Sequence, residues 1–239
     1  MNLNSTKIKS LQQRRAAWLL TGIACVLSVS IFSCGKDSST TVTTASLSVV
    51  AGSPDLPTTD LYLNSGLAAS TLVYGSYVPY LAISAGTVKV GLDYTGTTTH
   101  LTGDTVNLAA NKAYSLFQTD LVAKHDHLLV TDTVVAPASG KASIRLVNMS
   151  PDAPSVDLIV GGVVVASNRA YKQVSSFKAI AVSDNDTLKV VQTGTTTVLG
   201  VVNAVTVQSG VVYTIWLGGF ASGLDGYGLK AYLIRNAAF

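Results

Sequence analysis

The stretch ASIRLVNMSPDAPSVDL at residues 142–158 has a counterpart, ASLSVVAGSPDLPTTDL, at residues 45–61. The offset is 97 throughout, and the pattern Ser-Pro-Asp-x-Pro-x-x-Asp-Leu is identical in the two copies. Farther along, Thr95–Thr99 matches Thr193–Thr197 at an offset of 98, a drift that a short loop insertion produces. Self-similarity at a fixed period indicates repeated structural units. The sequence therefore predicts two homologous domains, at 45–137 and 141–239.

Each copy has the composition and the alternation typical of β-structure. Val and Thr, which are β-branched and favour strands, make up 53 of the 206 residues from Cys34 onward. The chain contains no Glu, a good helix former. Short apolar runs such as Val156–Val160 are separated by turn-forming residues such as Gly161-Gly162, and Asp184–Asp186 is interpreted as another hairpin turn. We expect about seven short strands per copy, and so an all-β fold of two tandem immunoglobulin-like β-sandwich domains.

The N-terminal segment has the pattern of an export and anchoring signal. Residues 1–15 are polar and basic, residues 16–32 are mostly apolar and uncharged, and Ser33-Cys34 follows. This is the order of a secretory signal peptide, and its Ser-Cys ending resembles that of bacterial lipoprotein signals. The resemblance implies a signal peptide at 1–33, cleavage before Cys34, and a flexible tether at 34–44 whose Cys34 carries acyl chains such as palmitate. An uncleaved membrane anchor is the alternative, because this apolar run is at the lower limit for spanning a bilayer.

The expected location follows from this signal. Lys36-Asp37, directly after Cys34, is similar to the charged surface-export signals of Bacteroidetes lipoproteins. We expect a lipid-anchored protein at the outer membrane or cell surface of a Gram-negative bacterium, with the membrane as a partner through the N-terminal lipid.

The charge balance argues against nucleic-acid binding. The formal net charge is +3, but four basic residues and no acid fall within residues 1–33. The rest of the chain therefore has twelve basic against thirteen acidic residues, and it lacks the basic excess that neutralises phosphates. Cys34 is the only cysteine outside the signal segment, which excludes a disulfide, a zinc–thiolate site and a cysteine nucleophile from the domains.

The repeated motif resembles a known family. Residues 145–158 closely resemble the opening motif of the bacterial domain of unknown function 4397, which runs approximately Arg-x-x-Asn-x-Ser-Pro-Asp-Ala-Pro-x-Val-Asp-Val. The first copy departs from it, with Ser48 in place of the Arg and Ala51 in place of the Asn. The resemblance implies a bacterial envelope protein with a β-sandwich fold, and it implies no activity. The matching residues are Ser53, Pro54, Asp55, Pro57 and Asp60 in the first copy, and Arg145, Asn148, Ser150, Pro151, Asp152, Pro154 and Asp157 in the second.

These motif residues have two interpretations. The acids could supply oxygen ligands to Ca²⁺, but each copy offers only two of the six to eight oxygens that this ion needs. A structural turn, in which Pro fixes φ and Asp accepts backbone hydrogen bonds, is the favoured interpretation. Asp157, pointing away from the core valines, is a candidate ion-pair partner for Arg145.

Two further groups of side chains are candidates for chemistry. His125 and His127 alternate onto one face of a strand and form a possible metal pair, but nothing places His100, the only other histidine, beside them. A solvated strand end is favoured, so no metal and no cofactor is predicted. Trp216, Tyr77 and Tyr80 are possible ligand contacts, because exposed aromatic rings stack on sugars; packing is the alternative for each.

No hydrolase or phosphate-binding signature occurs in the chain, which predicts a non-enzymatic protein. We therefore expect a non-catalytic, lipid-anchored structural or adhesive surface module with other envelope proteins as partners. The alternative is a glycan-binding lipoprotein associated with an outer-membrane nutrient importer. Exposure of the three aromatic rings would favour the glycan hypothesis, and their burial would favour the structural one.

Overall fold

The computed structural model describes residues 43–239. The predicted signal peptide at 1–33, the lipidation at Cys34 and the tether up to residue 42 lie outside the described residues. Thr44, the last residue of the predicted tether, already begins the first strand. Within 43–239, no helix has the length and apolar character needed to cross a membrane.

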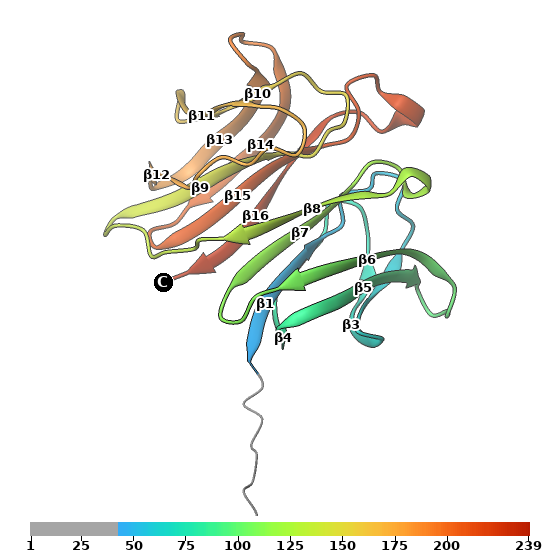
Figure 1. The fold of residues 1–239 in the computed structure, drawn as a ribbon. Helices are drawn as coiled ribbons and strands as arrows, with labels where there is room; N and C mark the ends of the chain where they lie inside the picture. Colours follow the sequence, from blue (N-terminus) through green and yellow to red (C-terminus); the bar gives the residue numbers. More distant parts are fainter. Residues whose placement is uncertain (1–42) are drawn as a thin grey trace, which may run out of the picture. The chain divides into compact units, whose positions relative to one another are not determined.

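The first repeat is a sandwich of two four-stranded sheets, in the orders β4-β1-β7-β8 and β3-β2-β5-β6. β1 is antiparallel to β4 and parallel to β7, and Figure 1 shows β1 in blue beside β7 in green. The eight strands are β1 (Thr44–Val50), β2 (Thr59–Leu63), β3 (Gly66–Leu72), β4 (Tyr77–Ser84), β5 (Gly86–Tyr94), β6 (His100–Leu108), β7 (Ala113–Thr119) and β8 (Asp126–Asp132).

The second repeat has the same plan, with sheets β12-β9-β15-β16 and β11-β10-β13-β14. Its first strand, β9, is again parallel to the penultimate strand, β15, and antiparallel to β12. The strands are β9 (Lys141–Asn148), β10 (Val156–Val160), β11 (Val163–Arg169), β12 (Lys178–Ala181), β13 (Ser183–Gln192), β14 (Val198–Val207), β15 (Val211–Gly218) and β16 (Lys230–Ala238).

Alternation along the strands divides the buried residues into three clusters. In β15, Tyr213, Ile215 and Leu217 point into the second sandwich, as the sequence pattern predicts, while Trp216 points the other way. The first sandwich has a core of its own. The third cluster joins the β1 and β7 sheet to the β9 and β15 sheet, and it contains Val50, Phe117, Val147, Met149, Trp216 and Ile234. Each repeat therefore uses one sheet twice, for its own core on one face and for the other repeat on the opposite face.

The fold predicted from the sequence is confirmed, with eight strands per repeat rather than about seven. The turn predicted at Asp184–Asp186 is wrong, because these residues lie inside β13. The register of β13 against β14 shifts on both sides of Asp186. Such irregularities accommodate extra residues in a strand without ending it, so polar residues that resemble a turn remain in the sheet.

A tight turn joins the second and third strands of each repeat. Asn64 and Ser65 both have positive φ, and so do Gly161 and Gly162 at the same place in the second repeat. Two consecutive residues with left-handed φ form a type I′ turn, and the twist of this turn matches the right-handed twist of the two strands that it joins. In the first repeat, the Asn64 side chain also accepts a hydrogen bond from the N–H of Lys89, 2.9 Å away, which fixes this hairpin to β5.

Candidate functional site

The second Asp of the repeated motif holds a turn in both copies. Asp60 accepts hydrogen bonds from the N–H groups of Thr71 and Gly96, at 3.0 and 3.1 Å, and from the Thr95 hydroxyl. The hydrogen bonds from Gly96 and Thr71 hold the pKa of Asp60 below its usual value. The structural interpretation explains this residue, because it ties the strand β2 to the Thr-Gly turn between β5 and β6.

Asp157 makes the equivalent contacts in the second copy. It accepts from the Asn168 N–H at 2.8 Å, the Thr193 hydroxyl at 2.7 Å and the Gly194 N–H at 3.3 Å. Burial opposes ionisation of its carboxyl, but these hydrogen bonds outweigh burial and keep the pKa of Asp157 below its usual value. The ion pair considered between Asp157 and Arg145 is not formed, because Arg145 pairs with another residue.

The first Asp of the motif binds a loop at the end of the penultimate strand. Asp55 accepts from the Val122 N–H at 2.8 Å, and Asp152 accepts from the N–H groups of Ala221 and Ser222 at 2.6 and 3.0 Å. Among residues 43–239, the only group of three metal-ligating side chains contains none of these acids. These hydrogen bonds agree with the turn interpretation of the motif rather than with the Ca²⁺ interpretation.

The other motif residues have structural positions in the two repeats. Asn148 donates to the backbone oxygen of Arg169 and accepts from the Ser150 N–H, while Ser53 and Ser150 are buried. Pro54, Pro57, Pro151 and Pro154 belong to the two loops that lead into β2 and β10.

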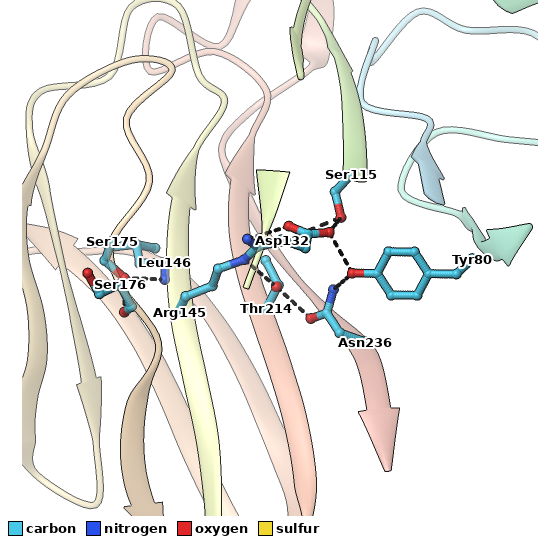
Figure 2. Close-up of polar contacts among 9 residues, drawn as sticks. All are labelled: Tyr80, Ser115, Asp132, Arg145, Leu146, Ser175, Ser176, Thr214 and Asn236. Atoms are coloured by element: carbon cyan, nitrogen blue, oxygen red, sulfur yellow. Dashed lines mark hydrogen bonds and ion pairs between the residues drawn. The ribbon is translucent and has the colours of Figure 1, made fainter. Parts of the chain in front are cut away.

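Arg145 forms a buried ion pair with the opposite repeat. Its Nη1 lies 2.6 Å from Asp132 Oδ1, and the two side chains are 3% and 0% exposed. Figure 2 shows Arg145 also donating to Thr214, at 2.9 Å, while Asp132 accepts from Ser115 at 2.6 Å. The guanidinium lies over the ring of Phe177. Arg145 therefore joins the two sandwiches. Its partner, Asp132, was not identified from the sequence.

Of the three candidate aromatic residues, Tyr80 and Trp216 have interior roles. The Tyr80 hydroxyl donates to Asp132, 2.5 Å away, and accepts from Asn236 (Figure 2). Burial, and secondly the charge of Asp132, raise the pKa of Tyr80 to about 12, so the hydroxyl stays a donor at neutral pH. Trp216 is fully buried and stacks on Tyr232 with ring centroids 4.5 Å apart.

Tyr77 is half-buried against the same inter-repeat cluster. The three rings therefore do not form an exposed sugar-stacking platform. The burial of Trp216 and the interior contacts of Tyr80 favour the structural interpretation of these residues over the sugar-stacking one.

An open groove lies on the outer face of the β2-β5-β6 sheet. It has a volume of about 460 Å³. Its floor is made by Gly91 and Gly103, which face each other on β5 and β6. The side chains around this floor come from both strands, from β2 and from the adjoining turns: Tyr62, Ser65, Lys89, Asp93, Thr98, His100 and Thr105.

The groove is polar without a strong charge. His100 Nδ1 lies 2.8 Å from Asp93 Oδ1, and the imidazole is 62% exposed. One lysine and two aspartates line the walls, so the site has no excess of positive charge for a phosphate. Hydroxyl groups, a histidine and one tyrosine ring around a flat floor are suited to a neutral ligand rich in hydroxyl groups.

The second repeat does not have this groove. Its positions equivalent to Gly91 and Gly103, by the pairing of β13 with β14, are Lys189 and Val201. The Asp93–His100 pair corresponds in the same way to Val191 and Val198. The shared fold therefore does not require the groove, and its residues are specific to the first repeat.

The histidine pair has a third partner that the sequence did not indicate. His125 Nε2 lies 3.0 Å from Asp104 Oδ2, and His127 Nδ1 lies 2.7 Å from Asp104 Oδ1. The two imidazoles lie on one side of the strand, as predicted, with an angle of 29° between their planes. The expectation of a solvated strand end is corrected, because β6 and β8 are the facing edges of the two sheets and bring a buried Asp104 against the histidines.

The comparisons with known proteins give a family and a distant structural similarity. A family model described as "Domain of unknown function (DUF4397)" matches residues 45–159 and again residues 142–235. No curated protein matches the chain. One similar solved structure is the crystal structure of CBMbc (family CBM26) from Eubacterium rectale Amy13K in complex with maltoheptaose. It is 10% identical, with a TM-score of 0.25, and the similarity covers 81% of this chain and 97% of that one.

Proposed function

The chain belongs to the DUF4397 family, whose domain is one of unknown function, and we propose that it is a non-catalytic binding module that holds a glycan in the groove of its first repeat. The observation that carries this proposal is the exposed groove with a glycine floor and hydroxyl-bearing walls. Its volume lies within the range of about 300–1,000 Å³ that is typical of small-ligand sites.

The glycine floor gives the proposal a local physical basis. Gly91 and Gly103 do not have positive φ, so the backbone does not require glycine at either position. A Cβ at Gly103 would lie 2.8 Å from His100 Nε2, and one at Gly91 would lie 3.1 Å from the same ring. Glycine at both positions therefore gives the His100 ring room to lie against the sheet, where the ring forms part of the groove surface that a ligand would meet.

The cellular setting is part of the same proposal. Lipidation of Cys34 would attach the chain to the outer membrane or cell surface of a Gram-negative, Bacteroidetes-like bacterium. A glycan-binding domain on a lipid anchor would work beside an outer-membrane nutrient importer, where it would concentrate glycans.

A second candidate function, a structural or adhesive surface module, is favoured by the aromatic residues. Trp216 is buried and Tyr80 is engaged with Asp132, so both serve the contact between the repeats. In this alternative the two stacked sandwiches act as a spacer that contacts other envelope proteins.

The experiment that tests the glycan proposal is an array screen of the full-length chain in detergent. Gly91→Lys and Gly103→Val place the residues of the second repeat on the groove floor, and the reciprocal Val201→Gly is the matched control. We expect one glycan class to bind the wild type and the control, and both floor variants to lose at least about tenfold in affinity.

Equal binding by the floor variants would place the ligand elsewhere and contradict the proposal. A blank array for a folded wild-type chain would favour the structural module, and cross-linking on whole cells would then identify its protein partners.

A further inference from the structure

We propose that Asp104, His125 and His127 form a binding site for a divalent transition-metal ion of the zinc type. The site lies beside the glycan groove proposed above and shares one residue with it, because Asp104 also lines that groove. One ligand atom from each side chain lies within 4.8 Å of the other two. Two imidazole nitrogens and a carboxylate oxygen are donors that zinc accepts.

The three side chains come from two sheet edges that face each other. Asp104 is on β6, His127 is on β8, and His125 directly precedes β8. β6 is the edge of one sheet and β8 the edge of the other. An ion at this place would join the two sheets on the open side of the sandwich, and such cross-links stabilise the folded state because the unfolded chain has no preformed site.

The burial of the cluster provides both a protected ligand set and a way in. The Asp104 side chain is 4% exposed and that of His125 15%, whereas that of His127 is 37% exposed. A buried carboxylate between two imidazoles holds the ligand set together, and the exposed ring gives an ion access from solvent. Three protein ligands leave one position of a tetrahedral zinc ion for water.

The second repeat shows that closing the sandwich does not need these residues. In the first repeat Asp104 pairs with Val90 across β5 and β6. The counterpart of Val90 is Leu188, which pairs with Val202, so Val202 is the counterpart of Asp104. In the first repeat His127 faces Gln118. The counterpart of Gln118 in the second repeat is Leu217, which faces Ala231, so Ala231 is the counterpart of His127.

Leu229, two positions before Ala231, corresponds to His125. These three counterparts are apolar and pack onto the core of the second repeat. The sheet edges can thus be joined by apolar contacts alone, so a structural role does not account for two histidines and an aspartate in the first repeat.

The test is metal binding by the full-length chain, purified in detergent without a polyhistidine tag. Zn²⁺ is titrated calorimetrically, thermal melting is followed with Zn²⁺ and after addition of EDTA, and Co²⁺ serves as a spectroscopic substitute for zinc. We expect one ion per chain, a rise in melting temperature that EDTA reverses, and the visible absorption of tetrahedral Co²⁺.

The variants separate this site from other histidines. Asp104→Val, His125→Leu and His127→Ala together install the residues of the second repeat. We expect this triple variant to lose at least the roughly 10–100-fold in affinity that even indirect supporting residues contribute. His127→Ala alone, at the most exposed ligand, gives the same test if the triple variant does not fold. His100→Ala removes the exposed histidine that pairs with Asp93 and should leave the binding unchanged.

Three results would overturn the proposal: no Zn²⁺-dependent change in the folded wild-type chain, full binding by the triple or the His127→Ala variant, or loss of binding in His100→Ala. The groove-floor variants Gly91→Lys and Gly103→Val retain all three metal ligands, and His127→Ala retains every residue that lines the groove. Loss of glycan binding and loss of metal binding are therefore tested in separate variants.

Discussion

At the scale of single residues, the ion pair between Arg145 and Asp132 has the largest consequence. Both side chains are buried, and removing one partner of a buried pair leaves an uncompensated charge. We predict that Arg145→Leu lowers the free energy of unfolding by about 3–5 kcal/mol, measured by urea denaturation. Adding Asp132→Leu to this variant should restore a large part of the loss.

The matched control for this prediction is the more exposed ion pair between Lys172 and Asp126, which also joins the two repeats. Because water screens an exposed pair, Lys172→Ala should cost less than about 1 kcal/mol. A cost for Arg145→Leu no larger than that of Lys172→Ala would show that the buried pair is not what holds this contact.

The motif residues Asp60 and Asp157 predict a dependence of stability on pH. Hydrogen bonds keep the pKa of each carboxyl below its usual value in the folded chain. Their contribution is therefore present above the unfolded pKa of about 3.9 and is lost as the pH falls through the folded pKa.

The double variant Asp60→Asn, Asp157→Asn should melt at a lower temperature than the wild type at about pH 7. It should also lose less of its melting temperature between about pH 7 and about pH 3. Parallel melting curves of the wild type and the variant across this range would refute the linkage.

At the scale of structural elements, the contact between β7 and the loop after β1 depends on Gly52. A Cβ at this position would collide with the backbone carbonyl of Gln118, at the place where Trp216 also packs. We predict that Gly52→Ala destabilises the chain by about 1–3 kcal/mol, measured by urea denaturation. Gly228→Ala is the control, since an added Cβ there meets nothing within 4 Å, and it should change stability by less than about 0.5 kcal/mol.

The elements could be predicted from the sequence wherever a local pattern determines them. Alternation in β15 correctly predicted that Trp216 points to the opposite face from Ile215 and Leu217. The internal repeat correctly predicted that the two motif loops occupy equivalent places in the two domains. Asp104 was missed because its contact with the histidines arises from two sheet edges meeting, which no spacing in the sequence records. The partner of Arg145 was missed for a similar reason, because Asp132 belongs to the other repeat.

At the scale of the whole molecule, the two repeats share a buried cluster and belong to one compact unit. We therefore predict that they unfold together, in a single calorimetric transition whose calorimetric and van't Hoff enthalpies agree. Trp216→Ala, which removes the largest side chain of the shared cluster, should lower stability by about 3–5 kcal/mol. Two resolved transitions in the wild type would show that the repeats are energetically independent.

The placement of Arg145 in one repeat and Asp132 in the other also affects which repeats can associate with each other. Two homologous sandwiches with similar contact faces could associate like with like, so that first repeats of different chains would dimerise. The first repeat has Ser48 where the second has Arg145, and Asn236 bonds Thr214 as Asp132 bonds Ser115. Pairing of two first repeats would bury two aspartates face to face, and pairing of two second repeats would bury two arginines. Only the union of a first repeat with a second pairs both charges, so this single salt bridge favours contact between unlike repeats over contact between like repeats.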